Sequence, residues 1–206
     1  MICINMRYVF LGACKWIRAI LILTCIFMNV TAIHAQNKIE REYRIKDHQV
    51  PASARIDVGQ FNFPKKIRWY IERNVDTFSV EAKTKTDLGC ISIEFSPEGE
   101  FMDLELEVKD DMINASVLRK IGSYFDANFR RWKMRKIQLQ YSHDIDLIRK
   151  QLEQPSYYDP IRPRYEIVAK GRDEHGMKLY EFLFGEDGSF VKKQQFTFKP
   201  VNNLQF

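Results

Sequence analysis

Residues 78–83 read FSVEAK and residues 165–170 read YEIVAK, and these two related stretches decide the fold that the sequence predicts. The first is followed by IEFSPEG and the second by FLFGEDG, so each leads into a strand and then an acidic turn that contains glycine. The same succession of alternating apolar segments and turns occurs around each stretch, in residues 64–107 and 130–196. Self-similarity of this kind indicates a duplicated unit. A duplicated unit constrains the architecture more strongly than any single motif does.

Alternation of apolar and polar residues predicts strands in both copies. The alternating segments of the first copy lie at 67–71, 78–82, 91–95 and 102–108, and those of the second at 137–141, 165–169 and 180–184. A last strand from Phe190 has an ambiguous alternation, and it is interpreted as an edge strand because Lys192 and Lys193 would discourage pairing with another chain.

A helix is predicted in front of each set of strands. The first is expected to be short because Gly59 interrupts its apolar spacing, whereas the second has Asn114 as a cap and a continuous apolar stripe. We therefore predict an α+β fold made of two tandem repeats, each with one helix packed on a four-stranded antiparallel sheet. A unit of roughly 60 residues would be marginally stable alone, so the two are expected to share a core or a continuous sheet.

The N-terminal residues have the order of parts that is typical of an export signal. Basic residues without any acid occupy positions 1–18, an apolar run follows at 19–28, and small residues lead to Ala35. This run is shorter than the roughly 20 apolar residues that span a bilayer. We predict cleavage after Ala35 and a periplasmic or secreted location, with membrane contact only through the uncleaved signal. A translation start at Met6 and lipid attachment at Cys14 stay open as alternatives.

The predicted organisation has four parts: a signal peptide at 1–35, a polar lead at 36–49, repeat 1 at 50–109, and repeat 2 at 112–198 with an insertion at 142–163. Removal of the signal leaves 171 of the 206 residues, with 29 basic and 27 acidic side chains. A nearly neutral chain lacks the basic excess of a nucleic-acid-binding protein, so no nucleic-acid partner is expected. Cys90 is then the only remaining cysteine, so no intramolecular disulfide can form, and its thiol is either covered or free to join two chains.

The order of these elements resembles the PepSY-like domains, including the tandem β-lactamase-inhibitor-like group of exported bacterial proteins. The resemblance rests on a helix, Pro64, the strand that begins Ile67-Arg68-Trp69, an aromatic-led strand and an acidic turn with glycine, and it covers about residues 50–198. The degraded first helix and the long insertion depart from the pattern. Members of this family are inhibitors, propeptide modules and periplasmic binding proteins, so the resemblance implies binding and brings no catalytic residues.

The sequence therefore predicts an exported, non-enzymatic binding protein, inhibitory or regulatory, that recognises a protein or peptide in the cell envelope. The insertion contains tyrosine, arginine and proline, which suit an interface that loses little entropy on binding. An equally weighted alternative is a surface lid. The residues proposed to bind the partner are Arg68, Tyr70, Tyr157, Tyr158 and Arg162.

No catalytic, cofactor or metal site is predicted. Asp103, Glu105 and Glu107 alternate on one strand and would spread over roughly 13 Å, whereas a calcium loop gathers its oxygen ligands around one point. We interpret them as a solvated strand face. His143 and His175 have no nucleophile at a recognisable spacing. Two alternative functions remain: a small-molecule or lipid carrier with a cavity between sheet and helix, and an envelope hydrolase.

Overall fold

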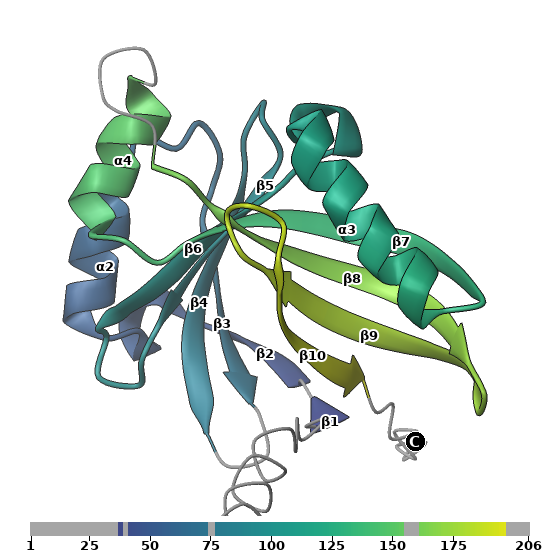
Figure 1. The fold of residues 1–206 in the computed structure, drawn as a ribbon. Helices are drawn as coiled ribbons and strands as arrows, with labels where there is room; N and C mark the ends of the chain where they lie inside the picture. Colours follow the sequence, from purple (N-terminus) through teal and green to yellow (C-terminus); the bar gives the residue numbers. More distant parts are fainter. Residues whose placement is uncertain (1–36, 39–40, 74–76, 155–160, 197–206) are drawn as a thin grey trace, which may run out of the picture. The chain divides into compact units, whose positions relative to one another are not determined.

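The computed structural model describes residues 37–38, 41–73, 77–154 and 161–196 (Figure 1). They belong to one compact unit, Gln36–Phe206, which contains the whole sheet and its core. No helix in the described ranges is long and apolar enough to span a membrane. The predicted signal peptide, the cleavage site at Ala35, and Tyr157 and Tyr158 lie outside the described residues.

The predicted fold class is wrong in its central feature, because the strands form one sheet and not a four-stranded sheet for each of two repeats. The sheet order is β1-β10-β9-β8-β7-β6-β5-β4-β3-β2, and all neighbours are antiparallel except the two-residue β1, which runs parallel to β10. Its strands are β1 (Asn37–Lys38), β2 (Arg41–Ile45), β3 (Arg68–Arg73), β4 (Phe78–Lys85), β5 (Cys90–Phe95), β6 (Phe101–Glu107), β7 (Arg131–Tyr141), β8 (Arg164–Asp173), β9 (Gly176–Phe184) and β10 (Phe190–Phe196).

The pairing of β6 with β7 removes the boundary between the two predicted sheets. Leu104 pairs with Tyr141 and Leu106 with Leu139, so the edges that two separate sheets would have left open are joined in a ladder. Unpaired backbone donors and acceptors at a sheet edge are costly when buried and prone to association when exposed, so one continuous sheet is the more stable arrangement.

The residues predicted to be a polar lead bring the two ends of this sheet together. β1 pairs with β10, whereas β2 pairs with β3, and only two residues separate β1 from β2. The sheet must therefore curl until its outermost strands approach each other, as Figure 1 shows for β2, β1 and β10. The predicted edge strand β10 consequently has a neighbour on each side.

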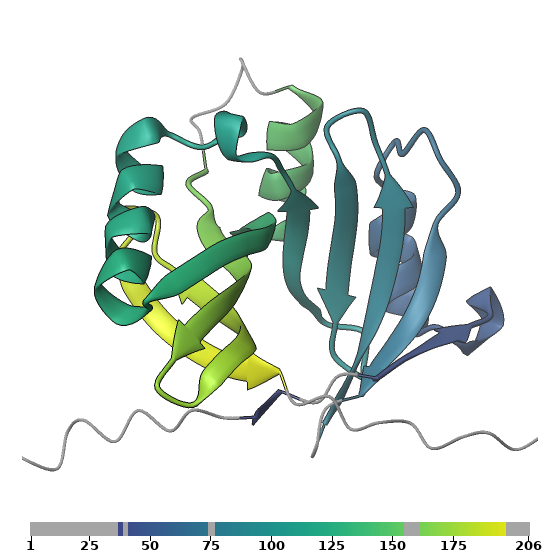
Figure 2. The ribbon, with the colours of Figure 1, turned by 90° about the vertical axis from the view of Figure 1, so that its right-hand side faces the viewer.

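Three helices cover the apolar, convex face of the sheet in the described part of the chain: α2 (Ala52–Gly59), α3 (Ala115–Asn128) and α4 (Ile145–Glu153), with short 3-10 turns at Asp47–Gln49 and Asp110–Met112. α2 and α4 lie over the half of the sheet that contains β3, and α3 lies over the other half (Figures 1 and 2). The cap predicted at Asn114 is confirmed, because its side chain accepts a hydrogen bond from the backbone amide of Ser116. Asp144 caps α4 in the same way, by accepting from the amides of Asp146 and Leu147.

One core of buried apolar side chains continues from one half of the sheet to the other. Beneath α3 it is rich in aromatic rings, and the Phe125 ring meets the Phe182 ring edge-to-face at 4.9 Å between centroids. Gly171 leaves room for the ring of Phe129 in this part of the core, because a Cβ atom at position 171 would lie 2.5 Å from that ring.

The turn that contains Gly99 holds the short helix α2 in place. Gly99 has a φ of 88°, which favours glycine, and the Ser53 hydroxyl donates a hydrogen bond to its carbonyl at 3.0 Å. A side chain at this position would also collide with Pro51. This support explains how α2 docks although its sequence is a poor helix former.

Candidate functional site

The concave face of the sheet is polar and encloses a cavity of about 620 Å³, which we call the acidic cavity. Eight strands, β3 to β10, contribute residues to its wall, which shows how strongly the sheet curls around it. The wall contains one ammonium group, that of Lys192, and six carboxylates: Glu72, Glu94, Asp103, Glu105, Glu166 and Glu181. Phe78 and Met102 also line it, with 43% and 48% of their surfaces exposed.

Curvature changes the environment that the sequence predicts for these acids. Glu105 is 8% exposed, and Asp103 and Glu94 are half-buried, so the interpretation of this strand face as solvated is wrong for them. Only Glu107, at the end of β6, is exposed as expected. Alternation identifies which residues share a face, but a face becomes a cavity wall only through the curl of the whole sheet.

Carboxylates stand directly opposite one another on neighbouring strands of this face. Glu81 of β4 pairs with Glu94 of β5, and Glu94 pairs with Asp103 of β6. Like charges in directly opposed positions destabilise a sheet. The chain thus accepts a cost in stability to keep negative charge at this position.

Two glutamines on β7 supply neutral polar groups beside the acids. The Gln138 amide donates to Glu105, and the Gln140 amide donates to Asp103 at 3.1 Å. Within the described residues, the carbonyl oxygens of both glutamines are shielded from solvent and accept no hydrogen bond, and the whole of Gln138 is only 3% exposed. A buried acceptor without a donor costs about 1–3 kcal/mol. Gln140 lines the acidic cavity whereas Gln138 does not, so of the two only the Gln140 oxygen would gain from a donor that entered the cavity.

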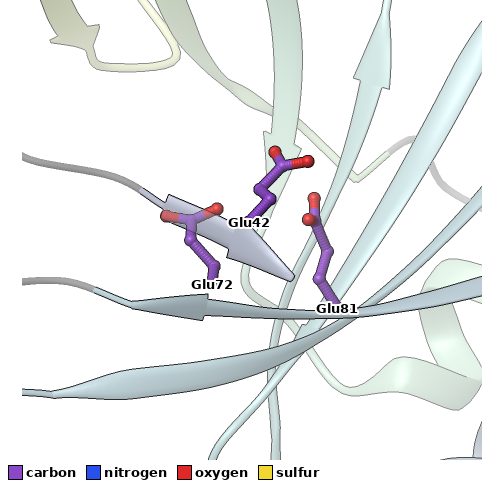
Figure 3. Close-up of side chains that lie close together, drawn as sticks. All are labelled: Glu42, Glu72 and Glu81. Atoms are coloured by element: carbon purple, nitrogen blue, oxygen red, sulfur yellow. The ribbon is translucent and has the colours of Figure 1, made fainter. Parts of the chain in front are cut away.

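A second acidic group, Glu42, Glu72 and Glu81, lies where β2, β3 and β4 adjoin (Figure 3). One carboxylate oxygen of each lies within 4.8 Å of the others, which is close enough to hold a cation. The Lys83 ammonium contacts two of them, at 2.6 Å from Glu42 and 2.9 Å from Glu81. The chain therefore provides its own cation for this group.

Burial and pairing have opposite effects on the two charges of this pair. Burial raises the pKa of the Glu81 carboxyl, and this effect exceeds the lowering by Lys83. Burial alone would lower the pKa of Lys83, but its hydrogen bond to Glu42 and the charge of Glu81 outweigh it, so the pKa is raised. Lys83 is thus held as a charged ammonium group beside a carboxyl that is reluctant to ionise.

The structure brings together two of the five residues predicted to bind a partner. Arg68 and Tyr70 line one open pocket at the other end of the concave face, and its volume is about 370 Å³. Arg162 is exposed in the segment between α4 and β8 and is not among the residues that line this pocket. Cys90 is exposed at the rim of the same pocket.

The sequence did not single out Glu72, Glu81, Glu166 and Glu181 as site residues. Three of them stand in a strand between apolar residues that face the core, Glu72 stands between Ile71 and Arg73, and each of the four is at most 9% exposed. The signal in the sequence that could have identified them is the repetition of glutamate at the polar positions of several strands. No family model, curated protein or solved structure matches this chain.

Proposed function

We propose that this chain is a non-enzymatic binding protein that holds a small cationic ligand in the acidic cavity. The observation that supports this most directly is a cavity of about 620 Å³ whose wall contains six carboxylates and one ammonium group. Small-molecule sites commonly have volumes of ~300–1,000 Å³. The predicted small-molecule carrier is thus favoured, although with a polar cavity on the concave face in place of a cavity between sheet and helix.

The chemistry of the wall favours an organic amine. Ammonium groups donate several hydrogen bonds, and the carboxylates together with the Gln140 carbonyl oxygen accept them. The exposed side chains of Phe78 and Met102 would cover the methylene groups of such a ligand, and the Phe78 ring can also face a cation. A single calcium ion needs about 6–8 oxygens at roughly 2.3–2.6 Å around one point, which is a much smaller site.

The predicted protein or peptide partner remains the second candidate. Lysine or arginine side chains of a basic peptide would present the same cationic groups to the acidic cavity. Export to the periplasm or the medium stays a proposal that rests on the sequence of residues 1–35. The absence of catalysis likewise rests on the lack of a recognisable nucleophile and base spacing in the sequence.

Isothermal titration of the chain from Gln36 with spermidine at low salt tests the proposal. We expect saturable binding that weakens as salt rises, because charge pairs supply the affinity. The double variant Glu94→Gln, Glu166→Gln should bind about tenfold or more weakly, since a hydrogen bond to a charged group contributes about 1.5–3 kcal/mol. Both residues line the acidic cavity, from β5 and β8.

The matched control is Glu174→Gln, Glu186→Gln, which removes the same charge from exposed positions outside the acidic cavity. Spermidine affinity should be unchanged in this control, and circular dichroism should show that both variants fold. Absence of spermidine binding by the unmodified chain, or an equal loss in both double variants, would contradict the proposal. Tighter binding of trilysine than of spermidine would select the peptide partner.

A further inference from the structure

The second polar pocket on the concave face has the opposite charge. It has a volume of about 370 Å³ and is lined by five cationic side chains, those of Lys65, Lys66, Arg68, Lys83 and Lys85. No acidic residue is among those that line it. We call it the basic pocket, and we propose that it binds the phosphate groups of a small phosphorylated ligand.

Four of the five cations of the basic pocket form no ion pair with another described residue. Lys83 is the exception, because Glu42 and Glu81 hold its ammonium group. Lys65, Lys66, Arg68 and Lys85 are exposed and form no ion pair among the residues that the structure describes: Lys83 alone of the five has a salt-bridge partner there. Four cations grouped without a counter-ion repel one another, and a bound anion would relieve that repulsion.

Backbone pairing fixes where several of these charges lie. Arg68 pairs with Lys83 across β3 and β4, and Lys83 pairs with Ser92 across β4 and β5, so the three side chains form a row on one face. The Thr84 hydroxyl donates a hydrogen bond to the Lys65 carbonyl at 3.1 Å. This bond fastens the segment before β3 to β4, so Lys65 is placed at the pocket by the sheet itself.

The donors around the basic pocket match a phosphate better than a single carboxylate. Arg68 offers a planar fork of N–H groups, and the lysines offer point charges. The hydroxyls of Tyr70 and Ser92 add neutral donors. A pocket with four available positive charges suits a dianion or a diphosphate. Arg68 and Tyr70 were predicted from the sequence to bind a partner. In the basic pocket, the ligand that they contact is a phosphate group.

The basic pocket is independent of the acidic cavity, because the two share no lining residue. Along β3 the polar face passes from Glu72 through Tyr70 to Arg68, so the sign of the charge reverses within one strand. Failure of amine binding at the acidic cavity would leave this inference untouched.

Titration calorimetry with pyrophosphate at low salt tests the inference on the chain from Gln36. We expect saturable binding, and a loss of affinity of about tenfold or more in the double variant Lys65→Gln, Lys85→Gln, because two charged contacts are removed. Both side chains are exposed and form no ion pair in the described residues, so the fold should be retained. The control is Lys133→Gln, Lys170→Gln, which removes two exposed lysines that pair across β7 and β8.

Flotation with vesicles distinguishes a soluble ligand from a lipid headgroup. One set contains phosphatidylcholine alone and the other equal parts of phosphatidylcholine and phosphatidylglycerol. Binding to the anionic vesicles that is lost only in the Lys65, Lys85 variant would support the inference with a headgroup as the source of phosphate. The inference would be overturned if the chain bound neither pyrophosphate nor anionic vesicles. It would also be overturned if the two lysine variants lost affinity equally, since that result would reflect net charge alone.

Discussion

The two faces of the single sheet bury different kinds of side chain. The convex face packs apolar side chains under three helices, and Phe95, Leu104 and Phe184 are all 0% exposed there. The concave face buries charge, with Glu81 at 3% and Glu181 at 5% exposure. Burial of apolar surface stabilises a fold, whereas burial of carboxylates opposes it. The difference indicates that the convex face supplies the stability that offsets the cost of burying carboxylates on the concave face.

The largest expected effect tests the convex face. Phe125→Ala should lower the free energy of unfolding by about 3–5 kcal/mol, because it opens a cavity among aromatic rings that cannot fully collapse. The ring of Phe125 lies 4.9 Å from that of Phe182 and 5.1 Å from that of Trp132. Urea denaturation followed by tryptophan fluorescence measures the change.

Phe78→Ala is the control on the concave face, since Phe78 is 43% exposed at the acidic cavity. It should change the free energy of unfolding by less than about 1 kcal/mol. If Phe125→Ala and Phe78→Ala lowered the free energy of unfolding by similar amounts, both faces would contribute equally to the stability of the fold. That result would contradict the proposed difference between the two faces.

The strands were predictable from the sequence because local alternation determines them. Ile91, Ile93 and Phe95 of β5 are all buried as the period of two requires. The single sheet was not predictable in this way, although the small size of each unit indicated that the two would share a core or a continuous sheet. Nothing in the alternation of residues 104–106 and 139–141 states that β6 and β7 share a ladder, because every strand offers the same backbone groups to any neighbour. Closure by β1 and β2 likewise depends on pairing between the two ends of the unit.

The candidate site was partly visible for the same reason. Arg68 and Tyr70 could be assigned to the polar face of a strand, and both line the basic pocket. The acidic cavity could not be foreseen, since Glu105 and Glu166 come from strands distant in sequence, and they line one cavity only because of a curvature that the sequence does not encode locally.

A smaller effect is expected from the ion pair on the concave face. Lys83→Met leaves the Glu81 carboxylate, whose side chain is 4% exposed, without its cation. We expect a loss of about 2 kcal/mol at neutral pH, less than the ~3–5 kcal/mol of a fully buried pair because Lys83 itself is partly exposed. Lys85→Met, two residues along the same face and exposed, should cost under about 0.5 kcal/mol.

The pH dependence of the Lys83 variant has a defined sign. A carboxyl whose pKa is raised on folding binds more protons in the folded state, so it opposes folding increasingly as pH rises above its ordinary value of 4.5. Loss of Lys83 raises the pKa of Glu81 further, so the destabilisation should be greatest at neutral pH and shrink below pH 4.5. Addition of Glu81→Gln should restore part of the lost stability. A loss that is independent of pH would rule out this mechanism.

The smallest effect concerns a charged group at the border of the convex face. The Tyr180 hydroxyl donates to Asp173 at 2.8 Å, and the Lys178 ammonium lies 3.3 Å from the same oxygen. The hydrogen bond from Tyr180, with that from the His175 amide and with Lys178, lowers the pKa of Asp173 to about 2. At this rim of the helix-covered face, the Asp173 carboxylate is thus stabilised by the donors that surround it.

A carboxyl with a lowered pKa adds stability that is present above its ordinary value of 3.8 and is lost as pH falls towards 2. Asp173→Asn should therefore flatten the acid side of the unfolding profile between these values and lower stability at neutral pH by less than the Lys83 substitution does. Glu174→Gln, the exposed neighbour, removes the same charge and should leave the profile unchanged. Thermal unfolding across this pH range compares the two variants. If both flattened the profile equally, net charge would be responsible, and the contact between Asp173 and Tyr180 would have no separate part in closing the rim of the core.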